Sequence, residues 1–436
     1  MSEASRLPVS ATDPLTAEAC RVFYARFLRL DPGVETILET VRQFPEDPAI
    51  RLACAFLWLF GQTPEAQRQS GEHLDRLEAL SGTITAREKA WLGAMRLWHG
   101  RSFEAATRAF EAITAQWPAD LPAAKAAEFL YYILGQQESG PRFLAHMERL
   151  AAHHPGDPDF LAMKAFAHEL CGQVGPAHDL AEEALERAPL NPWAHHALEH
   201  ALLWEGSPEE AVDRLESWLE LWEQSGRFIY CHNAWHVALM HLDRLAPERA
   251  FAIYDRHVWS ERPVMVVEQL DAISFLWRAE MAGVAVDPAR YQALVPHFRS
   301  LADTLFMPFV TAQYAYAFAR AGEREALEGV LRRVDERAAQ DDPDARHAWA
   351  PVGRSIIRGV AALGEGDAAA AAQWMDPVMD RMTRIGGSDA QDDLFRFAHW
   401  ESLRQAGRRA DARAVLERRL ALKRPSPLER ELLASV

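Results

Sequence analysis

The chain of 436 residues has only four cysteines, and no two of them form a CxxC pair. This spacing excludes a zinc knuckle and a thioredoxin-like redox motif. So few thiols in so long a chain also give no disulfide framework. We therefore expect four free, mostly buried thiols, at Cys20, Cys54, Cys171 and Cys231.

Long hydrophobic runs are absent as well. The densest apolar run, from Leu52 to Phe60, is far shorter than the ~20 residues that a membrane-spanning helix needs. The first residues, MSEASRLPVSATDP, have no basic start followed by an apolar stretch, which predicts that there is no signal peptide. We expect a cytoplasmic protein that has no membrane partner.

Positive charge is scarce, because 63 acidic residues face 47 basic ones and the net charge is −16. Such a surface repels phosphate backbones, so we expect no nucleic acid partner.

Several catalytic motifs are also missing. The sequence contains no glycine-rich phosphate loop, no GxSxG motif and no dinucleotide-binding fingerprint.

What the sequence does contain is a repeat. Turn residues recur every 34 to 44 residues, close to the ~34-residue period of tetratricopeptide hairpins. No alternating strand pattern interrupts them. The sequence therefore predicts an all-α, tetratricopeptide-type helical-hairpin solenoid of about ten hairpins, curved around an inner cavity. The predicted turns lie at Gly61, Gly100, Gly135, Gly172, Gly206, Asp243, Gly283, Gly322, Gly366 and Gly407.

In six of these turns an alanine follows the glycine by five residues. A glycine can end the first helix in a left-handed conformation, and a small residue early in the second helix lets the two helices approach closely. No low-complexity linker divides the array, so we predict one repeat domain over residues 1–436. Its parts are an N-terminal segment (1–30), the repeats (31–424) and a C-terminal tail (425–436).

Four segments carry a resemblance to a known family. WAHHALEHALLWEG (193–206), YCHNAWHVALMHL (230–242), LDAISFLWRAEMAG (270–283) and IGGSDAQDDLF (385–395) resemble the tetratricopeptide repeat protein 38 family. Weaker similarity covers most of the chain from about residue 12 to about residue 400. The resemblance implies a helical repeat fold and no particular activity.

The chain departs from that family's pattern at several positions. Glu199 stands where the family usually has a small residue, and Asp392 stands where it has an arginine. The family also tends to carry an Asp and a His where this chain reads Pro308, Phe309 and Val310. A site that uses those two groups in relatives would be altered or absent here.

Two HxxxH motifs, His196/His200 and His232/His236, are offset by 36 residues, one repeat length. Residues four apart share a helix face, and the first helices of successive repeats lie side by side. We therefore expect the four imidazoles to converge. Neutral imidazole binds zinc-like divalent metals, so metal ligation by all four histidines is one hypothesis. The other is that they only hydrogen-bond to carboxylates in a packed wall.

The first motif also reads HxxEH, the pattern in which two histidines hold zinc and a glutamate activates water. Here Glu199 would be the catalytic base, and Asp271 is a second catalytic candidate. The pattern is short, and this fold is not the one in which it usually acts. A metal-dependent hydrolase is therefore the alternative function, and the sequence leaves open whether the protein is an enzyme.

Aromatic, acidic and basic side chains crowd into the same repeats, which favours a binding pocket for a small molecule or peptide centred on residues 193–282. The alternative is that these aromatics only fill the space between hairpins. The candidate binding residues are His196, His200, His232, Asn233, Trp235, His236, Tyr254, Glu268, Asp271 and Arg278.

Further along, Ser388 and Gln391 predict a capping box at a helix start. Asp389, Asp392 and Asp393 crowd that start with negative charge, so we expect no phosphate there.

Overall fold

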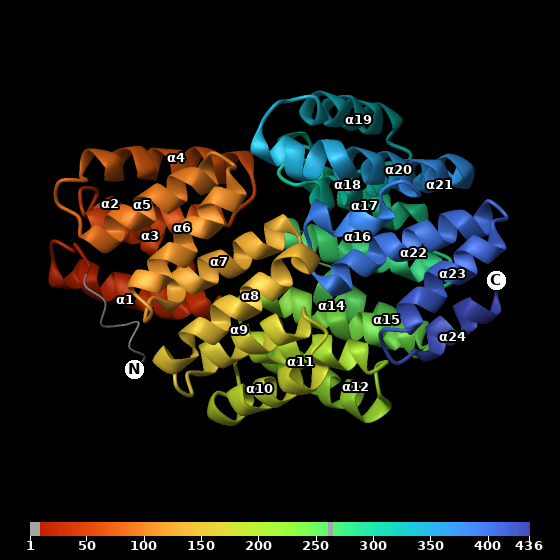
Figure 1. The fold of residues 1–436 in the computed structure, drawn as a ribbon, viewed down its shortest axis with the longest axis horizontal. Coiled ribbons are helices and arrows are strands. Elements are labelled where there is room, and N and C mark those ends of the chain that lie inside the picture. Colours follow the sequence, from red (N-terminus) through yellow and green to blue (C-terminus); the bar gives the residue numbers. More distant parts are fainter. Residues whose placement is uncertain (1–8, 260–264) are drawn as a thin grey trace. The chain divides into compact units, whose positions relative to one another are not determined.

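The computed structural model describes residues 9–259 and 265–436, and within these ranges every regular element is a helix. The all-α prediction is confirmed. Ten pairs of consecutive helices form the predicted hairpins in this part of the chain (Figure 1). The pairs are α3 (Pro48–Leu59) with α4 (Pro64–Ala79), α5 (Ala86–His99) with α6 (Phe103–Gln116), α7 (Leu121–Leu134) with α8 (Gln136–Leu150), α9 (Pro158–Glu169) with α10 (Val174–Arg187), α11 (Pro192–Trp204) with α12 (Glu209–Glu216), α14 (Arg227–Asp243) with α15 (Pro247–Ile253), α16 (Val266–Met281) with α17 (Pro288–Phe298), α18 (Pro308–Ala321) with α19 (Arg324–Ala338), α20 (Arg354–Gly364) with α21 (Ala368–Met375), and α22 (Asp389–Gln405) with α23 (Arg409–Leu420).

The remaining elements flank or connect these pairs. They are the helices α1 (Pro14–Arg29), α2 (Ile37–Gln43), α13 (Leu219–Trp222) and α24 (Pro427–Ala434), the 3-10 turns η2 (Val34–Thr36), η3 (Ala151–His153), η5 (Ala302–Thr304) and η7 (Met379–Ile385), and the π-helical segments η4 (Tyr254–Val258) and η6 (Ala345–Gly353). The predicted N-terminal segment and C-terminal tail therefore each contain a helix. Residues 1–8 of that segment lie outside the described residues.

The described residues group into two compact units. The first runs to Leu134 and includes Ser139–Ala197 and Glu223–Ile229. The second comprises Gly135–Glu138, Leu198–Trp222 and Tyr230–Val436. Because α8, α11 and α14 each contribute residues to both units, the single repeat domain stays a prediction.

All ten predicted turn positions lie at the ends of first helices, but the left-handed residue is not always the glycine. At Gly100 it is the next residue, Arg101, with φ 59°, and the alanine five residues after Gly100 is exposed. The buried residue is instead Ala106, five residues after Arg101. The prediction that Ala105 is the small contact residue is wrong, because at this turn the left-handed residue and the buried alanine both lie one position later than predicted.

In the first unit, aromatic rings form a continuous core across successive helices. The ring of Phe56 lies 4.6 Å from that of Phe27 and 4.9 Å from that of Trp91. Below them, Asp120 accepts hydrogen bonds from Arg87 Nε at 2.6 Å and Trp91 Nε1 at 2.8 Å. The buried guanidinium of Arg87 and the buried indole of Trp91 thus share one carboxylate as their hydrogen-bond partner.

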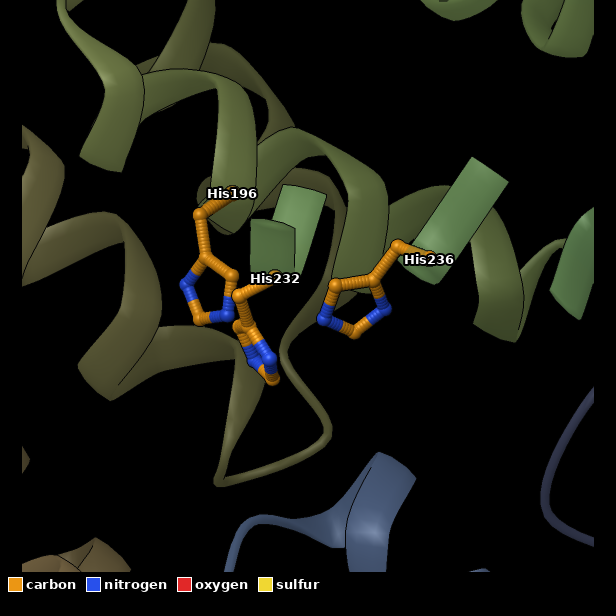
Figure 2. Close-up of side chains that lie close together, drawn as sticks. All are labelled: His196, His232 and His236. Atoms are coloured by element: carbon orange, nitrogen blue, oxygen red, sulfur yellow. The ribbon is translucent and has the colours of Figure 1, made fainter. Parts of the chain in front are cut away.

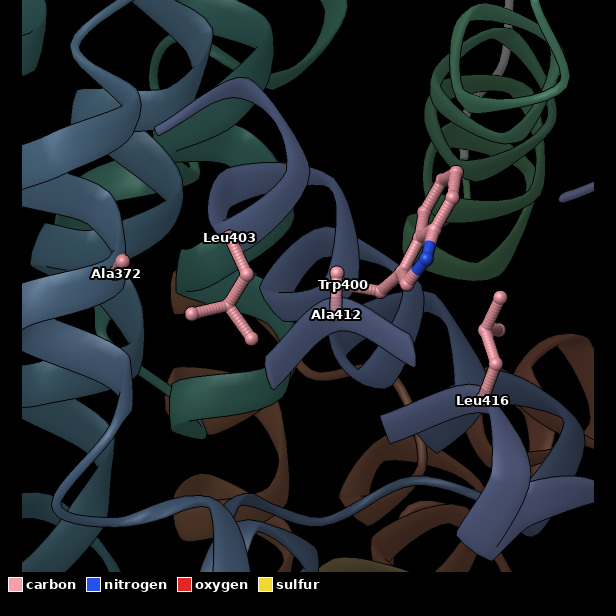
Figure 3. Packing of buried hydrophobic residues seen from close by; sticks show 5 residues of the cluster. All are labelled: Ala372, Trp400, Leu403, Ala412 and Leu416. Carbon is pink, nitrogen blue, oxygen red and sulfur yellow. The ribbon is translucent and has the colours of Figure 1, made fainter. Parts of the chain in front are cut away.

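In the second unit, the last hairpin packs through a small apolar cluster. Trp400 and Leu403 of α22 lie against Ala412 and Leu416 of α23, with Ala372 of α21 beside them (Figure 3). Ala412 is one of the alanines that follow a turn glycine by five residues, and it is fully buried. Its small side chain allows α23 to approach α22, as the repeat pattern predicts.

The four cysteines are free, as expected. Cys20, Cys54 and Cys231 are buried, and Cys171 is partly exposed. Burial raises the pKa of the Cys54 thiol to about 12, which keeps it protonated and unreactive at neutral pH.

No described helix combines the length and the apolar character that crossing a bilayer demands.

Candidate functional site

A cavity of about 270 Å³ lies within the second unit. The first helices α11, α14 and α16 form one wall, and the C-terminal helices α22, α23 and α24 form the other. Figure 1 shows α16, α22 and α23 side by side. About half of the lining is apolar: Leu203, Leu239, Leu242, Met281, Ala282, Met379, Ala390, Phe397, Val415, Leu422, Leu428 and Leu432. The polar lining consists of His200, Trp204, Asp243, Arg278, Asp389, Asp393, Arg396, His399, Arg418, Arg419 and Lys423.

Asp389 joins the two walls of this cavity. It is the first residue of α22, and its Oδ1 lies 3.0 Å from His200 Nδ1. Its Oδ2 accepts a hydrogen bond from Trp204 Nε1 at 2.9 Å. Because a carboxylate oxygen accepts, Nδ1 of His200 donates this hydrogen bond, which fixes the orientation of the ring. One carboxylate thus positions two side chains of the opposite wall.

Three of the four HxxxH histidines belong to the second unit, and they are neighbours. The ring of His236 lies 4.7 Å from that of His200 and 4.8 Å from that of His232, measured between centroids. His232 Nδ1 lies 3.0 Å from Asp271 Oδ1, and its ring stacks on Trp235 at 5.1 Å. Figure 2 shows His232 and His236 on neighbouring turns of α14. The structure therefore brings together one complete HxxxH motif and His200 of the other.

His196, also labelled in Figure 2, belongs to the first unit. Its ring is buried between Phe166, at 5.1 Å, and Trp193, at 5.5 Å. Because His196 and the other histidines belong to different units, the convergence of all four imidazoles stays a prediction.

Glu199, the predicted base of a hydrolase, is completely buried. Neither carboxylate oxygen has a hydrogen-bond partner among the described residues. Burial raises the pKa of this carboxyl well above its usual range, against a smaller opposing effect of His200. The carboxyl is closed off from solvent and does not line the cavity described above, so this environment does not suit a base that must reach a water molecule.

Asp271, the other catalytic candidate, is also buried, and it orients His232. Burial raises the pKa of Asp271, while the nearby His232 acts in the opposite direction. A buried carboxylate behind a histidine is a common arrangement in both metal sites and catalytic sites, because it fixes the tautomer of the ring.

The other candidate residues have mainly structural surroundings. Tyr254 stacks on Phe275 with ring centroids 4.6 Å apart, and Asn233 is fully buried in the middle of α14. Glu268 accepts a hydrogen bond from Met265 N at 3.1 Å and so caps the start of α16. Of the predicted binding residues, only His200 and Arg278 line the cavity.

The negative charge at the start of α22 is more fully compensated than the three aspartates in its sequence indicate. Asp393 pairs with Arg419 at 2.6 Å and with Arg396 at 3.2 Å. Asp392 is fully buried, and burial raises the pKa of its carboxyl well above the usual range, which favours the neutral acid. Together with the bonds of Asp389, this leaves little uncompensated negative charge at the helix start.

The positions that depart from the resembled family are buried. Phe309 packs against Phe395 with ring centroids 5.9 Å apart, and Pro308 and Val310 lie beside it at the start of α18. Gly387, at φ +110°, separates Phe309 from Asp392, since a Cβ there would lie 3.0 Å from the phenyl ring and 3.5 Å from the carboxylate. Phe309 and Asp392, two positions at which the chain departs from the family pattern, thus both lie next to Gly387.

Sequence reasoning missed the C-terminal wall of the cavity. A signal for it exists, because Val415, Arg418, Arg419 and Leu422 follow the i, i+3, i+4, i+7 spacing of one helix face. This face of α23 combines apolar and basic side chains, so it is neither a typical core face nor a typical solvent-exposed face. Nothing in the spacing, however, pairs this face with α11, about two hundred residues earlier in the chain.

No family model matches the chain. Two solved structures show limited similarity. One is a chain in the structure of Naa15/Naa10 bound to HypK-THB, with 13% identity and a TM-score of 0.25, matching 96% of this chain and 65% of that chain. The other is the pentatricopeptide repeat protein PPR10 from maize, with 13% identity and a TM-score of 0.18, matching 97% of this chain and 75% of that chain.

This chain thus spans 65% of the length of the first of these proteins. These TM-scores are too low to support a fold assignment. The assignment of the fold is therefore based on the ten hairpins of this chain. Membership of the tetratricopeptide repeat protein 38 family stays a prediction.

Proposed function

We propose that the protein is a tetratricopeptide-type binding protein that holds a small organic molecule in the cavity of its second unit. The observation that carries this proposal is the combination of an apolar lining with a few fixed polar groups. His200, Trp204 and Asp389 hold one another in place, and Arg278 lies on the same wall as the first two. Such concave sites bind through apolar contact and orient the ligand through polar contact.

The size of the cavity favours a small molecule over a peptide. Its 270 Å³ lies just below the range of about 300–1,000 Å³ that is usual for drug-sized ligands. A peptide would need an extended groove with room for several side chains. Helices from both ends of the second unit instead enclose a short space.

Filling the cavity is expected to abolish binding. Ala282 lines it at the end of α16, so Ala282→Phe places a phenyl ring where the ligand would lie. A suitable probe is octanamide, a neutral molecule with an apolar chain, titrated by calorimetry. Displacing two or more methylene groups, at ~0.8 kcal/mol each, predicts at least about tenfold weaker binding.

Ala285→Phe is the matched control, since Ala285 is exposed three residues further on and does not line the cavity. This variant is expected to bind octanamide like the wild type, and both variants are expected to melt near the wild-type temperature. Equal binding by Ala282→Phe and the wild type would contradict the proposed site, and so would no binding of octanamide to the wild type.

A metal-dependent hydrolase remains the second candidate, supported by one observation. His200 and His232 each place Nδ1 against a carboxylate, Asp389 and Asp271 respectively, an arrangement that commonly orients metal-binding histidines. Glu199 is completely buried and does not line the cavity, which does not support a water-activating role. Elemental analysis of the purified protein distinguishes the candidates, because stoichiometric zinc or a similar metal would favour the hydrolase.

A further inference from the structure

Most charged groups around the cavity are already paired within the second unit. Arg419 binds Asp393 and also Glu429, the latter at 3.0 Å, and Lys423 binds Glu429 at 2.9 Å. Arg396 shares Asp393. These pairs occupy the acids of the C-terminal wall and leave them little capacity to attract a cationic ligand.

Arg278 is different. One of its Nη2–H groups donates to the backbone carbonyl of Ala390, and its guanidinium carbon lies 5.9 Å from the centre of the Trp235 ring. Its Nε is buried and has no hydrogen-bond partner within residues 9–259 and 265–436. In the same ranges, no carboxylate forms an ion pair with it. A guanidinium has five N–H donors, so most of its capacity is unused.

The overall balance of the lining is also positive. Five lining residues are Arg or Lys, and three are Asp. Of the acids, Asp389 is held by His200 and Trp204, and Asp393 by its two arginines. Asp243 accepts a hydrogen bond from Ser207, and burial raises the pKa of its carboxyl, with Lys423 opposing that effect. A surplus of cations is notable in a chain whose net charge is −16.

We propose that the ligand is an amphiphilic carboxylic acid, bound with its carboxylate against Arg278 and its apolar part along the leucines of the cavity. The inference rests on the proposed function and names the chemical class of the ligand. A carboxylate supplies the anion that Arg278 lacks, and the planar guanidinium matches its geometry. Burial lowers the pKa of Arg278 to about 10, as expected for a cation with too little compensating charge.

Among the described residues that line the cavity, Arg278 is the one cationic residue that is not exposed and has no carboxylate partner. One such cation fits a carboxylate better than a phosphate. Phosphate sites in proteins usually combine several cations or a helix start with free amides. Here the amide of Gln391 is bound by Ser388 Oγ at 3.3 Å, and that of Ser388 by Gln391 Oε1 at 3.0 Å. The nearest helix start is therefore capped by its own side chains.

The test compares octanoate, octanamide and octyl phosphate on the whole protein by titration calorimetry. The three probes share an eight-carbon chain and differ in the head group. We expect octanoate to bind at least about tenfold more tightly than octanamide, as a charge-assisted hydrogen bond of ~1.5–3 kcal/mol implies. Arg278→Gln is expected to remove this preference while octanamide still binds, and Arg278→Lys to retain part of it.

Arg409→Gln is the matched control, because it removes the same charge from an exposed arginine of α23 that does not line the cavity. We expect it to change the preference by less than about twofold, since an exposed charge is screened by solvent. Equal binding of octanoate and octanamide to the wild type would overturn the carboxylate inference while leaving the binding pocket intact. Tighter binding of octyl phosphate would also overturn it. Binding of none of the probes would contradict the proposed function and, with it, this inference.

Discussion

Replacing Trp277 by alanine is expected to destabilise the protein by about 3–5 kcal/mol, the usual loss for a large aromatic side chain removed from a core. Trp277 is fully buried on α16. Its ring stacks on Tyr316 at 3.7 Å with an interplanar angle of 8° and meets Phe395 edge-on at 6.0 Å. The substitution would leave a cavity between α16, α18 and α22. Urea denaturation followed by circular dichroism measures the change.

Trp374→Ala is the matched control within the second unit. Trp374 is half-buried on α21, where Arg354 and Arg358 lie over its ring. We expect a smaller loss of about 1–2 kcal/mol, because solvent already reaches this indole. Equal losses for the two variants would show that Trp277 is not a core residue of the second unit.

Replacing Glu199 by methionine is expected to stabilise the protein at pH 8. The carboxyl is completely buried and has no hydrogen-bond partner among the residues described. A polar group in this state typically costs ~1–3 kcal/mol, and an unbranched apolar side chain of similar length removes that cost. Thermal unfolding of the variant and the wild type measures the difference.

The effect should depend on pH in a definite direction. The pKa of Glu199 in the folded state is raised above its ordinary value of 4.5, so the folded state holds the proton more tightly than the unfolded state. Stability contributed by the neutral acid is fully present below pH 4.5 and is lost as the pH rises toward the folded-state pKa. The advantage of Glu199→Met should therefore be larger at pH 8 than at pH 5.

Glu210→Met serves as its control, because Glu210 is exposed on α12 and should show no such pH dependence. A methionine variant at 199 that is less stable than the wild type at pH 8 would contradict the expectation that the buried carboxyl destabilises the folded state.

The hairpin array could be predicted from the sequence because each turn carries its own local signal. A residue that ends a helix and the residue that packs five positions later belong to the same short segment. At Gly100 the pattern is shifted by one residue: Arg101 adopts the left-handed conformation, and Ala106 is buried in place of Ala105. At Gly61 the left-handed residue is also the next one, Gln62, yet the predicted Ala66 stays buried. Local patterns locate a hairpin but do not fix its register to one residue.

The candidate site could be predicted only in part, for a related reason. The repeat offset correctly indicated that His200, His232 and His236 are neighbours, since they lie on first helices of consecutive hairpins. The contact between His200 and Asp389 joins residues 189 positions apart, and no periodicity signals it. Side chains on the C-terminal wall therefore acquire their role only when the chain folds back on α11.

The most direct test of the binding proposal is an experimental structure of the protein with octanoate. We predict density for the ligand inside the cavity, with its carboxylate within hydrogen-bond distance of the Arg278 guanidinium and its chain against Leu239 and Leu242. Octanoate bound elsewhere with the cavity filled only by water, at concentrations where calorimetry shows saturation, would contradict the account.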